Sequence, residues 1–165
     1  MKKTLFLAIC LSSFLSCIPD TKTKQEPYSS LTTVTGDDSE MNEAIEEANE
    51  TIQDFNDALK SNEQDYNYFT LKTRFVTPDG DIEHIWIGNI TLKGGQYYGI
   101  VDNLPENTAE VKYGDTIQIH NDNISDWMYL DGKVLHGGYT LRVLRDRMTR
   151  QERRQFDLEN EMIIY

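Results

Sequence analysis

The first strong pattern in the chain is a helical stripe of apolar side chains. From Ser39 onward they recur mostly every three or four residues, a spacing that places them on one face of an α-helix. Asp38 or Ser39 can cap the first turn, and Asn62 lies where the helix should stop. Carboxylates cover the other face, which is more typical of a solvated surface than of a docking surface. We therefore predict one amphipathic helix, with a stripe formed by Met41, Ala44, Ile45, Ala48, Ile52, Phe55 and Leu59.

After this helix the apolar period changes to two, as in β-strands. Residues 68–76 alternate apolar and polar side chains, and Pro78-Asp79-Gly80 predicts a turn into a second strand over 82–92. That strand carries Ile85, Trp86 and Ile87 in succession, so it is apolar on both faces and should be central in its sheet. Turn residues then separate four shorter segments with strand-like composition, at 97–101, 116–120, 124–130 and 133–136.

The last part of the chain returns to helical spacing. Gly137-Gly138 ends the strands, and the apolar spacing within 140–148 favours a helix, although a strand is the alternative there. Thr149 and Glu152 match a capping box, which predicts another short helix that continues past Phe156. The order of elements predicts an α+β fold: one N-terminal amphipathic helix packed on a five- to six-stranded, mainly antiparallel sheet, with short C-terminal helices.

The N-terminal segment has the layout of an export signal. A positively charged start and an apolar run over residues 4–15 lead to Ser16, a small residue directly before Cys17. The string Phe14-Leu15-Ser16-Cys17 resembles a bacterial lipobox, in which the cysteine becomes acylated; a plain secretory signal is the alternative. We therefore expect an exported protein that is lipid-anchored to an inner or outer membrane of the cell envelope. Its expected parts are a signal peptide over 1–16, lipidation at Cys17, a flexible tether over 17–38 and a single domain over 39–165.

Charge and cysteine content narrow the possible functions. The 165 residues include 16 Lys and Arg against 28 Asp and Glu, for a formal net charge of -12. Such a surface repels nucleic-acid phosphates, so we expect no nucleic-acid partner. Both cysteines, Cys10 and Cys17, lie within the first twenty residues, which leaves the domain without a thiol nucleophile, a disulfide or a cysteine zinc site. Arginines concentrate near the C-terminus, where balancing the acidic helix is favoured over binding an acidic partner or lipid head groups.

A series of short strings resembles the bacterial YegJ-like family, a domain of unknown function numbered 2314. The resemblance extends from about Met41 to Met148. It implies a domain assignment and no mechanism, because no activity or catalytic residue is established for the family. The strings are Glu83-His84-Ile85-Trp86-Ile87, Tyr98-Gly99, Asn103-Leu104-Pro105, Tyr113-Gly114-Asp115, Ile124-Ser125-Asp126-Trp127-Met128-Tyr129 and Gly137-Gly138-Tyr139-Thr140-Leu141-Arg142.

The histidines are the candidates for acid–base chemistry. His84 with Glu83, or His120 with a nearby carboxylate, can form the base and orienting group of a small hydrolase. His84 shares its strand face with Ile82 and Trp86, so a hydrogen-bonded core histidine is the favoured interpretation. His120 is expected to be exposed. No two histidines have the short spacing of paired metal ligands, and no phosphate-binding or dinucleotide-binding motif occurs, so we expect no metal and no cofactor.

The candidate binding residues lie around the Ser-Asp-Trp-Met and Gly-Gly-Tyr strings. Adjacent strand residues point to opposite faces, so either Asp126 or Trp127 should enter the core while the other leaves it. If Asp126 is inward, it needs backbone N–H partners and becomes a structural staple. Large aromatic residues are numerous enough for some to be exposed near the glycine turn, where they suit a binding surface. The candidates are Asp126, Trp127, Tyr129, Gly137, Gly138 and Tyr139.

Two functional classes follow. The favoured one is a lipid-anchored interaction module of the envelope that binds a protein or a small envelope ligand, for example an immunity-type protein. The alternative is a small hydrolase that uses the His84 or His120 pair. An acidic, tethered domain without a convergent catalytic string favours binding over catalysis.

Overall fold

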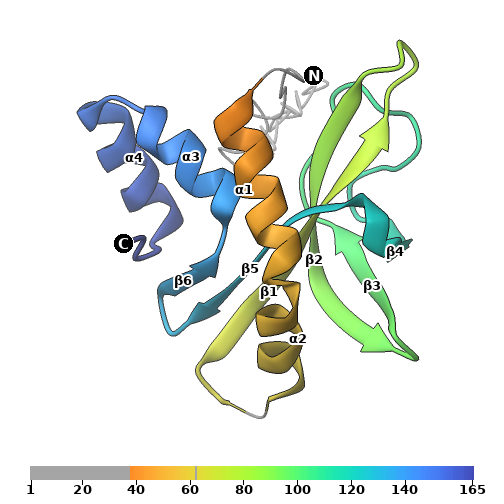
Figure 1. Ribbon diagram of the computed structural model, residues 1–165, viewed down its shortest axis with the longest axis horizontal. Helices are drawn as coiled ribbons and strands as arrows, with labels where there is room; N and C mark the ends of the chain where they lie inside the picture. The colour runs from red at the N-terminus through yellow and green to blue at the C-terminus, as the bar shows by residue number, and fades with distance from the viewer. Residues whose placement is uncertain (1–37, 62) are drawn as a thin grey trace, which may run out of the picture.

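The computed structural model describes residues 38–61 and 63–165. In this part the chain forms one six-stranded antiparallel sheet and four α-helices, which confirms the predicted α+β class (Figure 1). The predicted signal peptide, Cys17 and all of the tether except Asp38 lie outside the described residues. The helices are α1 (Ser39–Glu50), α2 (Ile52–Lys60), α3 (Tyr139–Arg147) and α4 (Arg150–Asn160), with a 3-10 turn, η2, at Asn121–Asn123.

The sheet has the strand order β4-β3-β2-β1-β5-β6. The predicted second strand, β2, is paired on both sides, as its apolar composition indicates. At the far edge, the C-terminal segment covers β6, because Leu135 N donates to Ile163 O at 3.0 Å and Ile163 N donates to Lys133 O at 2.8 Å. The strands are β1 (Tyr66–Val76), β2 (Ile82–Lys93), β3 (Gln96–Val101), β4 (Thr116–Ile119), β5 (Ile124–Asp131) and β6 (Val134–Gly137).

The predicted N-terminal helix is interrupted at Thr51, which separates α1 from α2. The Trp127 indole N–H donates to the Ala48 carbonyl oxygen at 2.9 Å and to Thr51 Oγ1 at 3.3 Å. A side-chain donor that enters the helical hydrogen-bond ladder is a recognised cause of a bend. Because the donor comes from β5, the apolar stripe alone did not reveal the interruption. The predicted N-cap is confirmed, since Asp38 accepts from Met41 N at 3.2 Å.

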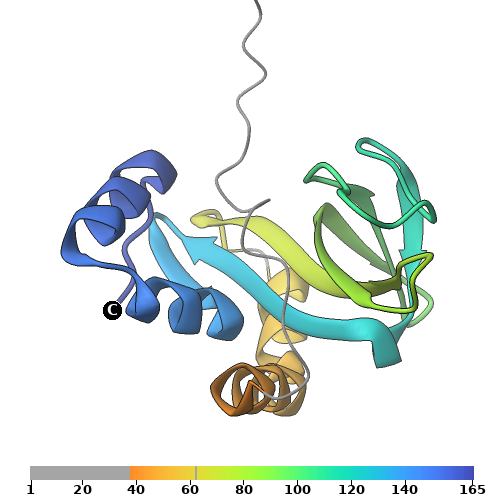
Figure 2. The same cartoon turned by 90° about the horizontal axis from the view of Figure 1, so that it is seen from above.

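Opposite faces of the sheet carry separate apolar clusters. In register, Leu71 lies beside Ile87 and Trp127, and these belong to the larger cluster with Ala48 and Phe55 of the N-terminal helices. The second cluster contains Trp86 and Met128 from the sheet, Leu135 of β6, Leu141 of α3 and Phe156 of α4. Figure 2 shows α1 and α2 on one side of the sheet and α3 and α4 at its β6 end.

The C-terminal helices begin as the sequence indicates. Residues 139–147 form α3 rather than a strand, and the predicted capping box is present at the start of α4. Thr149 N donates to Glu152 Oε2 at 2.7 Å, and Glu152 N donates to Thr149 Oγ1 at 3.3 Å. Among the described residues, each helix is too short or too polar to cross a lipid bilayer.

Candidate functional site

Asp126 is the centre of a buried polar cluster between β5 and α3. Its carboxylate accepts hydrogen bonds from Trp127 N at 2.8 Å, Tyr139 N at 3.2 Å and Thr140 N at 2.9 Å. Thr140 Oγ1 donates to the same carboxylate at 2.6 Å. Burial is the largest influence and raises the pKa of Asp126, against the lowering effects of Thr140 and of the Lys72 charge. Asp126 therefore joins β5 to the first turn of α3 as a structural staple.

Lys72 is the cationic member of this cluster. It pairs in register with Trp86 on β2 and Asp126 on β5, so the three side chains share a sheet face. Its Nζ donates to Thr140 Oγ1 at 3.2 Å and lies 5.3 Å from the centre of the Trp86 ring. Burial lowers the pKa of Lys72, while Asp126 acts in the opposite direction. The alternating pattern of β1 gave no sign that this lysine is buried, because its cover comes from α3.

His84 is buried beside the same cluster, as the favoured interpretation of the sequence predicts. Its Nδ1 lies 2.8 Å from Ser125 Oγ, which donates in turn to Lys72 O at 3.3 Å. Burial lowers the pKa of His84 to about 4, and the charges of Lys72 and Arg74 act in the same direction. The imidazole is therefore neutral at pH 7, and Ser125 is fully buried beside it.

Glu83 lies on the opposite face of β2 from His84. Its carboxylate accepts from the backbone N–H groups of Glu106, Asn107 and Thr108 at 2.7, 3.0 and 2.7 Å. These bonds hold the loop that follows β3. His120 lies after β4 and is exposed. The structure thus does not bring together the candidate residues of the hydrolase alternative.

No group of three or more metal-ligating side chains occurs in the parts of the chain that the structure describes.

The aromatic candidates lie in the core rather than on the surface. Trp127 and Tyr129 are 3% and 7% exposed and stack with a centroid distance of 6.2 Å. Tyr139 is half-buried, with its ring 5.7 Å from Trp127, and its hydroxyl oxygen accepts from Thr51 Oγ1 at 2.9 Å. The expected exposed aromatic surface near the glycine turn is therefore wrong. So is the expectation that Asp126 or Trp127 leaves the core, because β5 is covered on both faces.

The two glycines serve the turn from β6 into α3. Gly137 and Gly138 have φ values of 68° and 66°, in the left-handed region that favours glycine. A Cβ on Gly137 would lie 2.2 Å from Trp127 O, so the backbone must pass directly over the core tryptophan. The left-handed backbone of the turn and the close contact with Trp127 account for both glycines, so neither requires a ligand.

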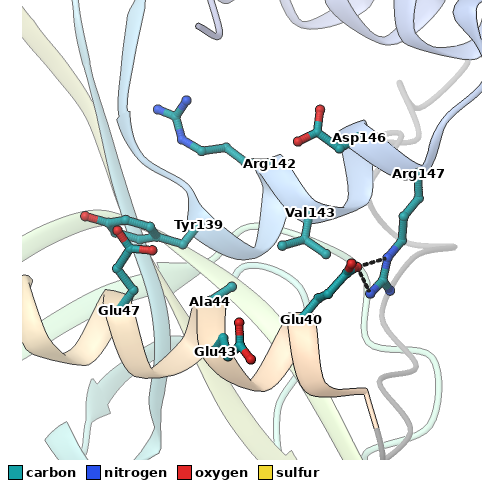
Figure 3. Close-up of a pocket in the computed structure, with 9 residues that line it drawn as sticks. All are labelled: Glu40, Glu43, Ala44, Glu47, Tyr139, Arg142, Val143, Asp146 and Arg147. Atoms are coloured by element: carbon teal, nitrogen blue, oxygen red, sulfur yellow. Dashed lines mark hydrogen bonds and ion pairs between the residues drawn. The ribbon is translucent and has the colours of Figure 1, made fainter.

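A groove between α1 and α3, shown in Figure 3, has a volume of about 440 Å³. Ala44 and Val143 give it apolar surface. Carboxylates of α1 and α3 border it: Glu43, Glu47 and Asp146. Within the described residues, Glu43 and Glu47 have no ion-pair partner.

The two arginines at this groove are already engaged. Arg142 donates to the carbonyl oxygens of Gly137, Tyr165 and Leu135 at 2.9, 2.9 and 3.0 Å. Arg147 binds Asp38 and Glu40 at 2.6 and 2.8 Å, and its hydrogen bonds lower the pKa of Asp38 to about 2. The two arginines of the groove thus form no ion pair with Glu43 or Glu47. The sequence had identified the acidic helix face but not the second wall, which α3 supplies.

Other C-terminal arginines also bind within the domain. Arg145 binds Asp157 through two contacts of 2.8 Å, and Arg153 lies 3.6 Å from Asp146. The expected balancing of the acidic N-terminal helix is therefore seen, among the described residues, for Arg147 alone, whereas Arg145 and Arg153 form ion pairs between α3 and α4.

Comparison with known proteins identifies the family. A family model described as an uncharacterized protein conserved in bacteria, DUF2314, matches residues 38–162. The chain belongs to the DUF2314 family. It is 35% identical over 112 residues to uncharacterized protein YegJ of Escherichia coli (strain K12), a match that covers 67% of this chain and 71% of YegJ. This confirms the resemblance that the strings from Glu83 to Arg142 indicated.

A second relative places DUF2314-like sequence in a larger protein. A putative ankyrin repeat protein of Neisseria meningitidis serogroup B is 38% identical over 80 residues, which is 48% of this chain and 32% of that protein. The chain therefore spans about a third of that relative. No solved structure matches this chain.

Proposed function

We propose that this DUF2314 chain is a lipid-anchored protein of the bacterial cell envelope whose domain binds a protein partner in the groove between α1 and α3. The observation that carries the proposal is that two carboxylates of that groove, Glu43 and Glu47, have no ion-pair partner among the described residues. An immunity-type protein, in which the partner is a toxin, is one form of this function.

The charge of the groove defines the partner's contact surface. Glu43 and Glu47 come from α1, and Asp146 comes from α3, where its carboxylate points away from α1 (Figure 3). Arg142 and Arg147 donate to other acceptors, and Asp146 lies 3.6 Å from Arg153, so Glu43 and Glu47 are the carboxylates to which a partner can supply complementary charge. Lysine or arginine side chains on the partner fit this requirement, and Ala44 with Val143 offers them apolar contact.

The Neisseria relative supports a binding role for the family. In that protein the matching segment accompanies ankyrin repeats, according to its name. Ankyrin repeats stack into extended concave surfaces that bind other proteins. A domain joined to such a surface fits recognition better than independent catalysis.

Chemical cross-linking in living cells tests the groove. We would place a photoreactive amino acid at Val143 in the groove and, as a control, at Leu158, which is 75% exposed on α4. We expect a discrete cross-linked protein from position 143 only, and its loss when Glu43 and Glu47 are both changed to Lys. Identical cross-linking from both positions, or persistence in the charge-reversed variant, would contradict the groove assignment.

The lipid anchor is tested by metabolic labelling with a fatty acid. Cys17→Ala should give an unlabelled, uncleaved or slowly processed precursor, because the acyl chains are attached to that cysteine. The matched control Cys10→Ala should be labelled normally, since the bulky Ile9 before Cys10 fits a lipobox poorly. Equal labelling of both variants would refute the lipidation of Cys17 and leave the groove proposal intact.

A further inference from the structure

The outward face of β2, β3 and β4 has a second cavity, far from the groove in sequence and chemistry. Tyr98 pairs in register with Thr91 on one side and Gln118 on the other, so these side chains share a face. The neighbouring Tyr97 points the opposite way and is buried in the larger core cluster. On that opposite face α2 packs against β3, where the Tyr97 hydroxyl donates to Asn56 Oδ1 at 2.6 Å. Figure 1 shows α3 and α4 at the β6 side of the sheet.

The cavity has a volume of about 410 Å³, within the range of small-molecule sites. Its side chains are almost all uncharged, with Lys93 as the one ionisable group other than Tyr98. This composition contrasts with the net charge of -12 for the whole chain. A metal cation finds no carboxylate in this lining, and an anion finds a single exposed lysine. The chemistry therefore suits an uncharged ligand.

The lining combines an aromatic ring with short hydrogen-bonding groups. Tyr98 is half-buried and presents its ring beside Ile100, while Asn89, Thr91 and Thr116 are exposed around it. Within the described residues, the side chains of Asn89, Thr91 and Thr116 have no hydrogen-bond partner. An apolar ring face surrounded by free amide and hydroxyl groups matches a molecule with an apolar ring face and a rim of hydroxyls.

The backbone beneath the cavity is irregular in a specific way. The register between β2 and β3 shifts between Gly88 and Thr91, and Asn89 has a φ of 52°. A bulge of this kind re-aims a side chain out of the regular ladder, and such features gather beside binding sites. Gly99 allows the close approach of β3, because a Cβ there would lie 2.7 Å from Gly88 O. Asn89 lies within the irregular segment between Gly88 and Thr91, and it lines the cavity.

We propose that this face of β2, β3 and β4 binds a saccharide. The Tyr98 ring stacks on the sugar ring, and the side chains of Asn89, Thr91 and Thr116 form hydrogen bonds with its hydroxyl groups. Lys93 borders the site and contributes no required charge. This site is separate from the groove between α1 and α3 and does not depend on its function.

Isothermal titration calorimetry with two oligosaccharides tests the proposal. The probes are maltotriose and N,N′,N″-triacetylchitotriose, added to the full mature chain in a detergent without a sugar head group. We expect saturable binding of at least one probe at concentrations up to about 10 mM. Absence of saturable binding for both probes overturns the proposal.

Matched variants assign the binding to this face. Tyr98→Ala should weaken the binding at least about tenfold, while Tyr98→Phe keeps the ring and should stay within about threefold of the parent. Asn89→Gly tolerates the left-handed backbone but lacks the amide, so it should also weaken binding about tenfold. The control Tyr113→Ala removes a tyrosine that is 63% exposed elsewhere and should bind normally.

Folding is monitored by circular dichroism, and the Asn89→Gly variant remains decisive if Tyr98→Ala fails to fold. Saturable binding that is unchanged in Asn89→Gly, or in a folded Tyr98→Ala, overturns the proposal.

Discussion

The strands β5 and β4 lie in the same sheet but experience opposite surroundings. In β5 the six residues from Ile124 to Tyr129 are all buried, because α1 and α2 cover one face of the strand and α3 covers the other. In β4 only Ile119 is buried. β3, between β4 and β2, alternates buried and half-buried or exposed residues.

This difference governs what polar side chains do in each region. We call the part of the sheet around β5, which is covered on both faces, the closed half. There Asp126 and Lys72 are removed from water and must find partners inside the protein, so their role is structural. We call the part of the sheet with the outward face of β2, β3 and β4 the open half. There Asn89 and Thr91 can remain without partners inside the protein, because water or a ligand can form hydrogen bonds with them. A polar residue is thus a candidate for binding in the open half and a staple in the closed half.

The strongest test of the closed half removes Asp126. Asp126→Ala leaves the backbone N–H groups of Trp127, Tyr139 and Thr140 and the Thr140 hydroxyl without this acceptor. It also removes the negative charge that acts on the buried Lys72. We expect a loss of about 3 to 5 kcal/mol in the free energy of unfolding, measured by denaturant titration. Thr91→Ala in the open half should change it by no more than about 0.5 kcal/mol. Similar losses in both variants would remove the distinction between the two halves.

Two tyrosines sharpen the comparison. Tyr129 on β5 packs against Tyr66, with a ring distance of 5.0 Å, and Phe69, at 5.3 Å. Tyr129→Ala should lower the free energy of unfolding by about 3 to 4 kcal/mol, because it leaves a cavity in the core. Tyr98→Ala on the outward face should lower it by less than about 1 kcal/mol. A larger loss in the free energy of unfolding for Tyr98→Ala than for Tyr129→Ala would show that the Tyr98 ring is buried in solution.

The pH dependence of stability provides a smaller effect. The pKa of His84 is about 4 in the folded protein, below the ordinary value of 6.5, so the unfolded chain binds a proton more readily. The His84 contribution is therefore complete above about pH 6.5 and is lost as the pH falls toward 4, by up to about 3 kcal/mol. Denaturant titrations across this pH range should show that the free energy of unfolding depends less on pH in His84→Asn than in the parent chain.

The matched control for this effect is His120, which is exposed in the open half. His120→Asn should keep the pH slope of the parent chain. A flattened slope in His120→Asn, with no change in His84→Asn, would contradict the burial of His84.

Local patterns in the sequence determined most of the elements. The stripe from Met41 to Leu59 indicated the N-terminal helices, and period-two alternation indicated the strands, because side-chain direction follows from backbone geometry alone. The capping box at Thr149 and Glu152 was also local, since both partners lie within one helical turn. The same local logic identified the family strings, and it also gave the prediction of an export segment.

Tertiary structure decided which of those residues are available to a ligand. The sequence could not show that Trp127 interrupts the first helix, that α3 covers Asp126 and Lys72, or that Tyr98 faces outward while Tyr129 does not. It showed the acidic face of α1 but not the groove, because α3 lies about a hundred residues away along the chain. Burial on the second face of a strand depends on contacts between distant segments, and neither periodicity nor composition records those contacts.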